Sequence, residues 1–205
     1  MKDSPWVGWD HFERLFSGPD FGRLLSNTLI LAFLNIVIAF PAPIIVALML
    51  NELRKQVLKK FIQTAIYIPH FLSWAIVSGL TYLLFALDIG PITVLFNDLF
   101  GGRFNFLADP DWFRPLIMTQ TLWKGTGWGT IIYLAALAGV DKQLYEAAMI
   151  DGAGRFQQLR HVTIPAIIPT VIIMLILNIG NFLDTGFEQI YMLTNSLNRD
   201  VADVF

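Results

Sequence analysis

Four long apolar runs dominate the chain and leave few folds open to it. They cover about residues 28–50, 64–87, 115–140 and 166–193. A helix rises about 1.5 Å per residue, so about 20 residues cross a hydrocarbon layer roughly 30 Å thick. Each run has that length, and helices satisfy their own backbone groups in lipid. We therefore predict an all-α, polytopic transmembrane helix bundle in which residues 1–205 form a single domain.

The composition excludes several other classes of protein. Charged residues make up 15% of the chain, against about 25% in a soluble domain, and the mean hydropathy is +0.58. The net charge of −2 gives no basis for binding nucleic acid. The chain has no cysteine, and His11, His70 and His161 lie far apart, so we expect neither a disulfide nor a metal site.

Positive charge is concentrated in two of the loops between the runs. Residues 51–63 and 141–165 carry lysine and arginine at a higher density than residues 1–26, 88–114 and 187–205, where most of the acidic residues lie. Loops rich in Lys and Arg stay on the cytoplasmic side of a membrane. We therefore place the first two loops in the cytoplasm and expect a multi-pass protein of the cytoplasmic (inner) membrane, surrounded by lipid.

The longest polar interruption in the second half is EAAMIDGAGRFQQLRHVTIP, residues 146–165. The small and apolar side chains before its glycines have helical spacing, and Asp141 stands where an N-cap residue belongs. Gly152 follows, and glycine tolerates the positive φ of a sharp bend. A second short amphipathic stretch is then predicted by the apolar residues Phe156, Leu159 and Val162.

This stretch resembles the EAA loop of ABC-importer permeases, the membrane subunits of binding-protein-dependent uptake systems. The family pattern is E-A-A, three residues, G, nine residues, then I-x-L-P. The chain matches this spacing with Glu146-Ala147-Ala148, Gly152 and Val162-Thr163-Ile164-Pro165, although Val and Ile replace the usual Ile and Leu. The resemblance implies a cytoplasmic coupling helix that docks into a groove of an ATPase subunit. The alternative is an amphipathic helical hairpin that only caps the bundle.

The resemblance also implies roles for individual residues. Glu146 would make a charged contact to the ATPase or a hydrogen bond that holds the helix. Ala147 and Ala148 would allow close approach, and Gly152 would make the bend that aims the helix. The residues expected to take part in this coupling are Glu146, Ala147, Ala148, Asp151, Gly152, Ala153, Phe156, Leu159 and Pro165.

Three further strings resemble permeases of the carbohydrate group, which import complex oligosaccharides or polysaccharide fragments. They are residues 6–12, residues 68–74 (IPHFLSW) and residues 186–195 (GFEQIYMLTN). The resemblance implies a transport subunit, not an enzyme, that works by alternating access. Its partners would be two ABC ATPase subunits, a second permease subunit in a heterodimer, and an extracytoplasmic solute-binding protein. ATP and Mg²⁺ would bind to the ATPase, so we expect no cofactor in this subunit.

Permeases of this group have one more span before, and one more after, the region that the four runs resemble. We therefore expect the chain to be the middle of a six-span subunit, truncated at both ends.

Polar residues interrupt the third run and are candidates for the substrate path. Lys124 and three glycines fall inside it, which predicts a broken helix at mid-membrane. Trp123 and Trp128 are placed there to stack on a sugar. The alternative is that the small residues pack against another helix and that Lys124 serves as a snorkelling anchor.

The fourth run carries a stripe of polar residues. Asn178, Asn181 and Asp184 lie three residues apart, and Glu188 follows four residues later. On one helix these side chains would share a face, so we predict that Asn178, Asn181 and Asp184 line the substrate path. The alternative is hydrogen bonding between helices.

Other functions are open at this stage. The chain could be a non-transporting membrane scaffold or assembly subunit, although a scaffold would leave the polar stripe unexplained. It could also be a permease for a solute other than a sugar. A secondary transporter would be expected to show inverted repeats, and an intramembrane enzyme would need a nucleophile and base or a metal cluster at membrane depth. The sequence shows none of these features.

Overall fold

The computed structural model describes residues 8–181 and 186–204. Every regular element in these ranges is a helix, in agreement with the predicted all-α class. Elements labelled η are π or 3₁₀ turns. In chain order the elements are α1 (Asp10–Phe16), α2 (Phe21–Leu34), η1 (Asn35–Ala39), α3 (Pro41–Glu52), α4 (Gln56–Tyr67), η2 (Ile68–Phe71), α5 (Trp74–Phe85), α6 (Pro91–Phe100), α7 (Pro110–Ala138), α8 (Lys142–Ile150), α9 (Arg155–Gln158), η3 (Leu159–Thr163), α10 (Ile164–Gly180), α11 (Phe187–Leu193) and α12 (Arg199–Ala202).

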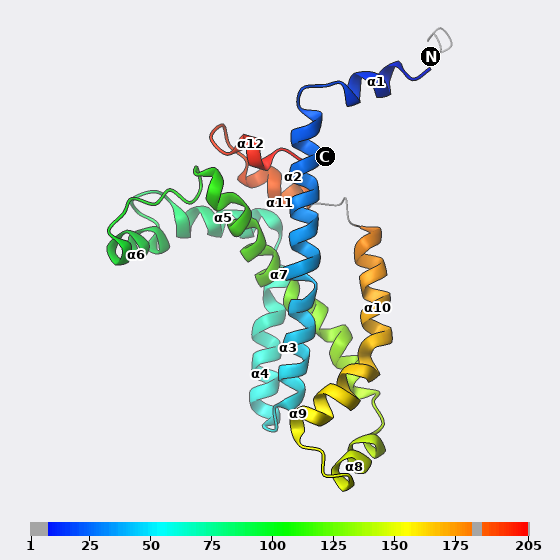
Figure 1. Cartoon of the computed structure of the whole chain (residues 1–205). Coiled ribbons are helices and arrows are strands. Elements are labelled where there is room, and N and C mark those ends of the chain that lie inside the picture. Colours follow the sequence, from blue (N-terminus) through cyan, green and yellow to red (C-terminus); the bar gives the residue numbers. More distant parts are fainter. Residues whose placement is uncertain (1–7, 182–185, 205) are drawn as a thin grey trace.

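The helices form an elongated bundle with two different ends (Figure 1). At one end, the loop end, lie α8, α9 and the turn between α3 and α4. At the other, the cap end, lie α5, α11 and α12. The two loops that the charge pattern assigns to the cytoplasm, residues 51–63 and 141–165, therefore meet at the same end of the molecule.

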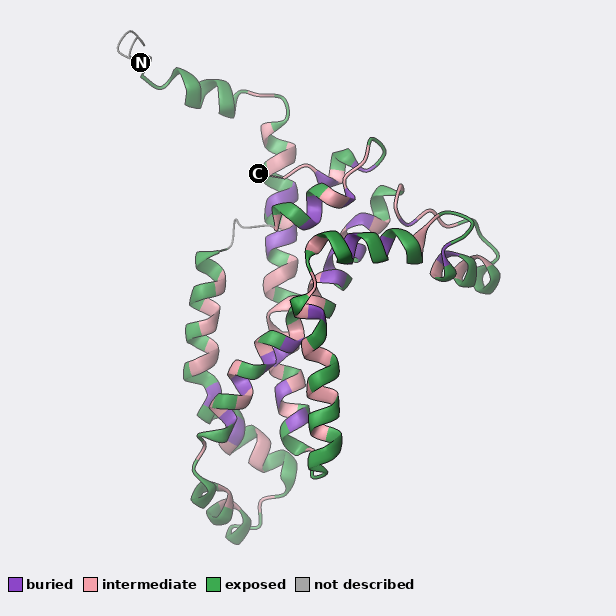
Figure 2. Cartoon of the chain, turned by 180° about the vertical axis from the view of Figure 1, so that it is seen from behind, coloured by how far each residue is buried: buried purple, intermediate pink, exposed green. Residues whose placement is uncertain are grey.

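Within the described residues, two helices are long and apolar enough to cross a membrane. One runs over Phe21–Glu52 (32 residues) and the other over Arg155–Gly180 (26 residues), and only 11% of the most apolar window of each is buried within the chain. Their apolar side chains thus face outward, as the exposed colouring of α10 in Figure 2 illustrates. Such a surface is stable in lipid or against further protein, and not in water.

Both of these helices contain a π turn just before a proline. In the first, η1 precedes Pro41, and the N–H of Phe40 donates to the Asn35 carbonyl over 2.8 Å. In the second, η3 precedes Pro165, and the N–H of Ile164 donates to the Leu159 carbonyl. Proline cannot donate and crowds the preceding turn, and a wider turn gives the backbone an alternative partner. At Pro41 the π turn accommodates the proline, and the helix continues beyond it (Figure 1).

The second predicted span, residues 64–87, is not a single helix. Residues 56–71 and 74–85 form two helical segments that meet at an angle of 102°. Pro69 weakens the first segment near its end, and Ser73 starts the second, because its Oγ accepts from the N–H of Ile76 over 3.4 Å. The second segment, α5, then runs sideways at the cap end toward α6 (Figure 1). Helix α6 itself occupies part of the region predicted as an outer loop.

The third predicted span is continuous, so the expected break at its glycines is wrong. Helix α7 extends unbroken for 29 residues, although it is not among the helices apolar enough to pass as a span. A Cβ at position 127 would overlap the backbone carbonyl of Ile66 in α4, and one at position 129 would lie 2.8 Å from Cγ of Pro43 in α3. Gly127 and Gly129 thus let three helices approach closely, which is the alternative that the sequence left open.

Lys124 belongs to the same contact. Its Nζ donates to the carbonyl of His70 over 2.8 Å and lies 5.1 Å from the centre of the Trp74 ring. The carbonyl stands at the bend between η2 and α5, where a helix that ends leaves acceptors without intrahelical donors. Lys124, which lies inside the third run, therefore forms its hydrogen bond at the point where the second predicted span bends. It does not snorkel to a membrane interface.

The fourth predicted span, residues 166–193, is shorter than expected. Helix α10 ends at Gly180, and α11 is a separate helix that begins at Phe187. The polar stripe predicted on one helix is therefore divided. Asn178 and Asn181 lie at the end of α10, Glu188 is exposed on α11, and Asp184 lies outside the described residues.

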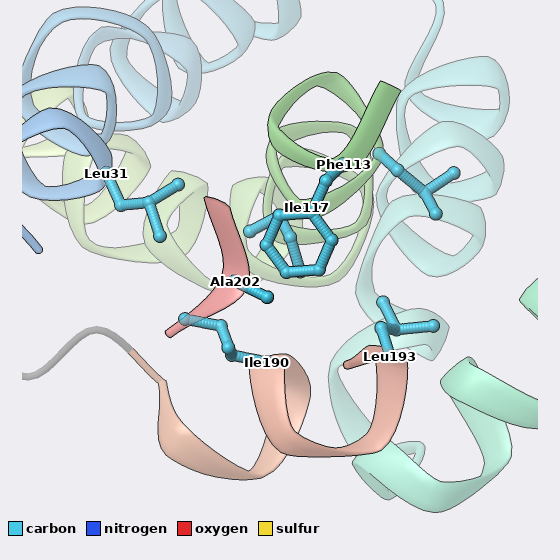
Figure 3. Close-up of a cluster of buried hydrophobic side chains, with 7 residues drawn as sticks. Leu31, Phe113, Ile117, Ile190, Leu193 and Ala202 are labelled. Carbon is cyan, nitrogen blue, oxygen red and sulfur yellow. The ribbon is translucent and has the colours of Figure 1, made fainter. Parts of the chain in front are cut away.

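Residues 186–204, here called the cap, pack between α2 and α7. Figure 3 shows Ile190, Leu193 and Ala202 of the cap against Leu31 of α2 and Phe113 and Ile117 of α7. Polar contacts reinforce this apolar cluster. Asn27 donates to the carbonyls of Asp200 (2.9 Å) and Asp203 (3.0 Å). The cap is thus held to the outer ends of two long helices.

We predict that Gly127→Ala destabilises the fold, whereas Gly125→Ala does not. A methyl group at position 127 meets rigid backbone, but one at position 125 meets nothing within 4 Å. Overpacking of this kind costs about 1–3 kcal/mol, which corresponds to about 3–10 °C in melting temperature for a chain of this size. Thermal unfolding of the two purified variants in detergent measures the difference, and equal melting temperatures would contradict the close approach of α4 and α7.

Candidate functional site

The polar loop predicted from the sequence folds as two short helices separated by a bend. Helix α8 is capped by Asp141, whose carboxylate accepts from the N–H of Gln143 over 2.9 Å. This confirms the predicted N-cap. The cap satisfies one of the free donors of the first helical turn and so fixes where α8 begins.

Gly152 makes the bend that ends α8. Its φ is +80°, and two hydrogen bonds close the helix: Gly152 N–H to Met149 C=O (3.0 Å) and Ala153 N–H to Ala148 C=O (2.8 Å). This pair of bonds is a Schellman motif, in which the residue after the helix must adopt a left-handed conformation. A side chain at this position would meet nothing within 4 Å, so glycine is required by its backbone and not by space.

The second half of the loop leads straight into the fourth span. The N–H of Gly154 donates to Oε1 of Gln157 over 2.8 Å and starts α9. Gln158 Nε2 then donates to the carbonyl of Ala153 over 2.9 Å and folds the bend back onto α9. Because α9, η3 and α10 form one helix of 26 residues, the loop is a direct extension of a long membrane helix.

The loop exposes a cluster of large apolar side chains at the loop end. The exposed fractions are 51% for Leu144, 56% for Met149, 87% for Ile150 and 71% for Phe156. Helix α8 buries none of its residues. An exposed apolar cluster on polar helices that project from a bundle (Figure 1) is typical of a protein–protein contact.

The residues predicted to take part in coupling are distributed around this cluster. Glu146, Ala147, Asp151, Gly152, Phe156 and Pro165 are exposed, whereas Ala148, Ala153 and Leu159 are half-buried. The exposed members are available to a partner. The half-buried alanines lie at the bend, where the N–H of Ala153 donates to the carbonyl of Ala148 in the Schellman motif.

A cavity of about 510 Å³ lies between the two long apolar helices and α7. Its walls come from α2, η1, α3, α7 and α10 and combine apolar groups with amides and hydroxyls. The polar side chains among its lining residues are Asn35, Thr121, Thr126, Tyr133, Asn178 and Asn181. Volumes of 300–1,000 Å³ with a few polar groups are typical of small-molecule sites.

The structure brings only some of the predicted substrate-path residues together. Asn178 and Asn181 line the cavity, but Trp123 and Trp128 do not. Trp123 lines a separate groove between α4 and α7, and Trp128 stacks on His70 with ring centres 4.5 Å apart. Two of the glycines that interrupt the third run, Gly125 and Gly129, also line the cavity, whereas Thr121, Thr126 and Tyr133 were not singled out from the sequence. Asn35 could have been, as the one amide side chain in the apolar run 28–50.

A buried polar network at the cap end of the cavity was also missed. Gln120 donates to Oγ1 of Thr81 (2.6 Å), and Gln189 donates to Oε1 of Gln120 (3.0 Å). Thr121, which lines the cavity, donates to Oε1 of Gln189 (3.3 Å). The network joins α5, α7 and the cap directly above the cavity. A glutamine inside an apolar run is a weak signal, because its partners are decided only by tertiary contacts.

Comparisons with known proteins identify relatives over most of the chain. The family described as binding-protein-dependent transport system inner membrane component matches residues 39–202. Protein LplB of Bacillus subtilis (strain 168) is 58% identical over 202 residues, which are 98% of this chain and 64% of LplB. The polygalacturonan/rhamnogalacturonan transport system permease protein YteP of the same organism is 53% identical over 202 residues, 98% of this chain and 63% of YteP. The chain thus spans a little under two thirds of the length of these relatives.

Two solved structures share the fold. A permease chain of a bacterial ABC transporter involved in the import of the acidic polysaccharide alginate superposes with a TM-score of 0.95 at 39% identity, covering 98% of this chain and 71% of that one. A chain of the alginate transporter in complex with an alginate pentasaccharide-bound periplasmic protein gives a TM-score of 0.93 at 38% identity, covering 97% and 69%. With the helical architecture and the capped loop described above, these matches show that the chain belongs to the family of binding-protein-dependent transport system inner membrane components.

Proposed function

We propose that the chain forms the pore of an ATP-driven, binding-protein-dependent ABC importer for carbohydrate, and that its solute is an oligosaccharide or polysaccharide fragment. Its partners are two ABC ATPase subunits, which bind ATP and Mg²⁺, a second permease subunit and an extracytoplasmic solute-binding protein. The permease itself catalyses no reaction and holds no cofactor. Its contribution is a path through the membrane and a mechanical connection to the ATPase.

The observation that carries this proposal is the loop of residues 141–165. A capped helix ends in a glycine bend, exposes a large apolar cluster at the loop end, and continues into a membrane helix. A part that docks on an ATPase and transmits its movement needs these three properties. Two sites are coupled only when both bias the same structural element, and here one helix carries the loop at one end and cavity residues at the other.

The carbohydrate assignment is supported by the relatives and by the cavity. YteP is described as a transporter of polygalacturonan and rhamnogalacturonan, and the two structural relatives as transporters of alginate. The amides of Asn178 and Asn181 supply donors and acceptors that suit sugar hydroxyls. Trp123 and Trp128 remain candidates for a sugar path outside this cavity, because both rings are about half exposed and an exposed aromatic ring can stack on a sugar face.

Two alternatives give different outcomes in the tests that follow. A scaffold would need the exposed apolar cluster for assembly but would not respond to solute. A permease for a solute other than a sugar would respond to a different loaded binding protein. Both predict no stimulation of ATP hydrolysis by a sugar-loaded binding protein.

The first test is the purified importer assembled from the full-length gene product and its co-expressed partners. We expect the ATPase to co-purify, and its hydrolysis to rise when the binding protein is loaded with an oligosaccharide from a panel of neutral and uronic acid oligomers. An ATPase that fails to bind would contradict the importer, and an ATPase that binds without responding to any member of the panel would contradict the sugar.

In that importer, Gly152→Ala should lower transport by about 5- to 30-fold, because a left-handed alanine costs about 1–2 kcal/mol. Gly152→Asn should lower it less, since asparagine visits this conformation more readily. Both side chains enter open space, so the pair separates the backbone effect from steric effects. Transport at the wild-type rate by both variants would show that the left-handed bend is not needed.

Replacement of Asn178 tests the cavity. Asn178→Ala should lower sugar transport by about two- to tenfold, the effect of losing one hydrogen bond to the solute, while the ATPase still co-purifies. Ile179→Ala is the matched control, because Ile179 is adjacent, 52% exposed and not among the lining residues. If both variants transport equally well, Asn178 does not contact the solute.

A further inference from the structure

The loop is tied to the fourth span by a pair of hydroxyl groups. Tyr145 of α8 and Thr163 of η3 are 18 residues apart in sequence, and Tyr145 Oη lies 2.9 Å from Thr163 Oγ1. Thr163 is buried, with 2% of its surface exposed, and Tyr145 is half-buried. Thr163 Oγ1 in turn donates to the carbonyl of Gln158 over 3.4 Å. When the Thr163 hydroxyl donates to Gln158, it accepts from Tyr145.

These bonds close a ring across the loop. Gln158 Nε2 donates to Ala153 C=O, immediately after the bend at Gly152. The ring therefore runs from α8 through Tyr145, Thr163 and Gln158 back to the end of α8. The π turn η3 is part of it. One extra residue in a helical turn rotates the residues before it by about 100° about the helix axis, relative to the residues after it. The π turn therefore determines which side chains of α9 face α8.

Without the hydroxyl bond, α8 would be attached to α10 mainly through the backbone. Helix α8 buries none of its residues, and the one-residue bend at Gly152 joins it to the rest of the loop. A force applied to α8 would then turn it about Gly152 and leave α10 in place. With the bond, α8 and the start of α10 move together, and α10 carries Met174, Leu177 and Asn178 in the wall of the cavity.

We infer that Tyr145 and Thr163 are positioning residues, whose hydroxyl bond holds the coupling helix α8 to α10 and passes its displacement to the cavity. The inference rests on the proposed importer function. It names a link inside the permease that is separate from the surface that contacts the ATPase. Its loss should therefore weaken the response to solute without weakening the binding of the ATPase.

The test uses Tyr145→Phe, Thr163→Val and the double variant in the complete importer. Tyr191→Phe and Thr170→Val are matched controls, because Tyr191 is exposed in the cap and Thr170 lies on α10 away from the loop. We expect each test variant to bind the ATPase normally. Stimulation of ATP hydrolysis by the oligosaccharide-loaded binding protein should fall about two- to tenfold, the effect of one hydrogen bond. The double variant should be no worse than Thr163→Val alone.

A distance measurement separates this role from a general loss of stability. Residues 1–205 contain no cysteine, and any cysteine elsewhere in the importer is first replaced by serine. Spin labels are then placed at Lys142→Cys on α8 and Ile176→Cys on α10, both exposed positions. In otherwise wild-type protein the distribution of distances between the two labels should be narrow with and without ATP. In Tyr145→Phe this distribution should broaden, while the melting temperature stays close to that of Tyr191→Phe.

Three results would overturn the inference. They are stimulation of both single variants at the level of the controls, additive losses in the double variant, or an unchanged distance distribution in Tyr145→Phe. A wild-type complex that binds no ATPase is a different result, because it would refute the importer function itself.

Discussion

The close approach of α7 to α3 and α4 is the contact on which the rest of the structure depends. Gly127 lies against the backbone at Ile66, and Gly129 lies against Pro43. Apolar side chains gain little by leaving lipid for another helix, so small residues and van der Waals contact must hold membrane helices together. An apolar cluster follows toward the loop end, where Ala47, Tyr133, Leu137 and Ile167 join α3, α7 and α10.

This contact also explains the polar residues of α7. Once α7 lies against α4, Lys124 is close enough to bond the carbonyl of His70 at the bend, and the bend directs α5 sideways. Gln120, one turn earlier, then meets Thr81 of α5 and Gln189 of the cap. Polar groups in a membrane are costly unless they are paired. Lys124 and Gln120 are paired with a carbonyl, a hydroxyl and an amide that the bent helix and the separate cap bring to them.

Proline has a consistent role in the two long apolar helices. In each of them a π turn stands directly before a proline, and the helix continues beyond it. The two turns occupy different places. The turn η1 borders the cavity through Asn35 and Ala39, whereas η3 borders the loop through Thr163. At both sites the regular α-helical pattern of backbone hydrogen bonds is interrupted. These helices can therefore bend there at a low cost in free energy.

The all-α fold class and the capped, glycine-bent loop at residues 141–165 could be predicted from the sequence alone. These follow from local rules: apolar length, the N-cap at Asp141 and the positive φ that only Gly152 adopts easily. The tertiary structure decided where helices break and which polar residues meet. Pro69 and Ser73 were visible in the sequence, but only packing brings Lys124 of α7 to the carbonyl at the 102° bend. Asn178 and Asn181 line the cavity because α10 faces η1 and α7 across it, and the pairing of Tyr145 with Thr163 joins residues that no sequence spacing connects. Contacts between helices join residues that lie far apart in the chain, and the spacing of residues in a single sequence does not indicate which of them will meet.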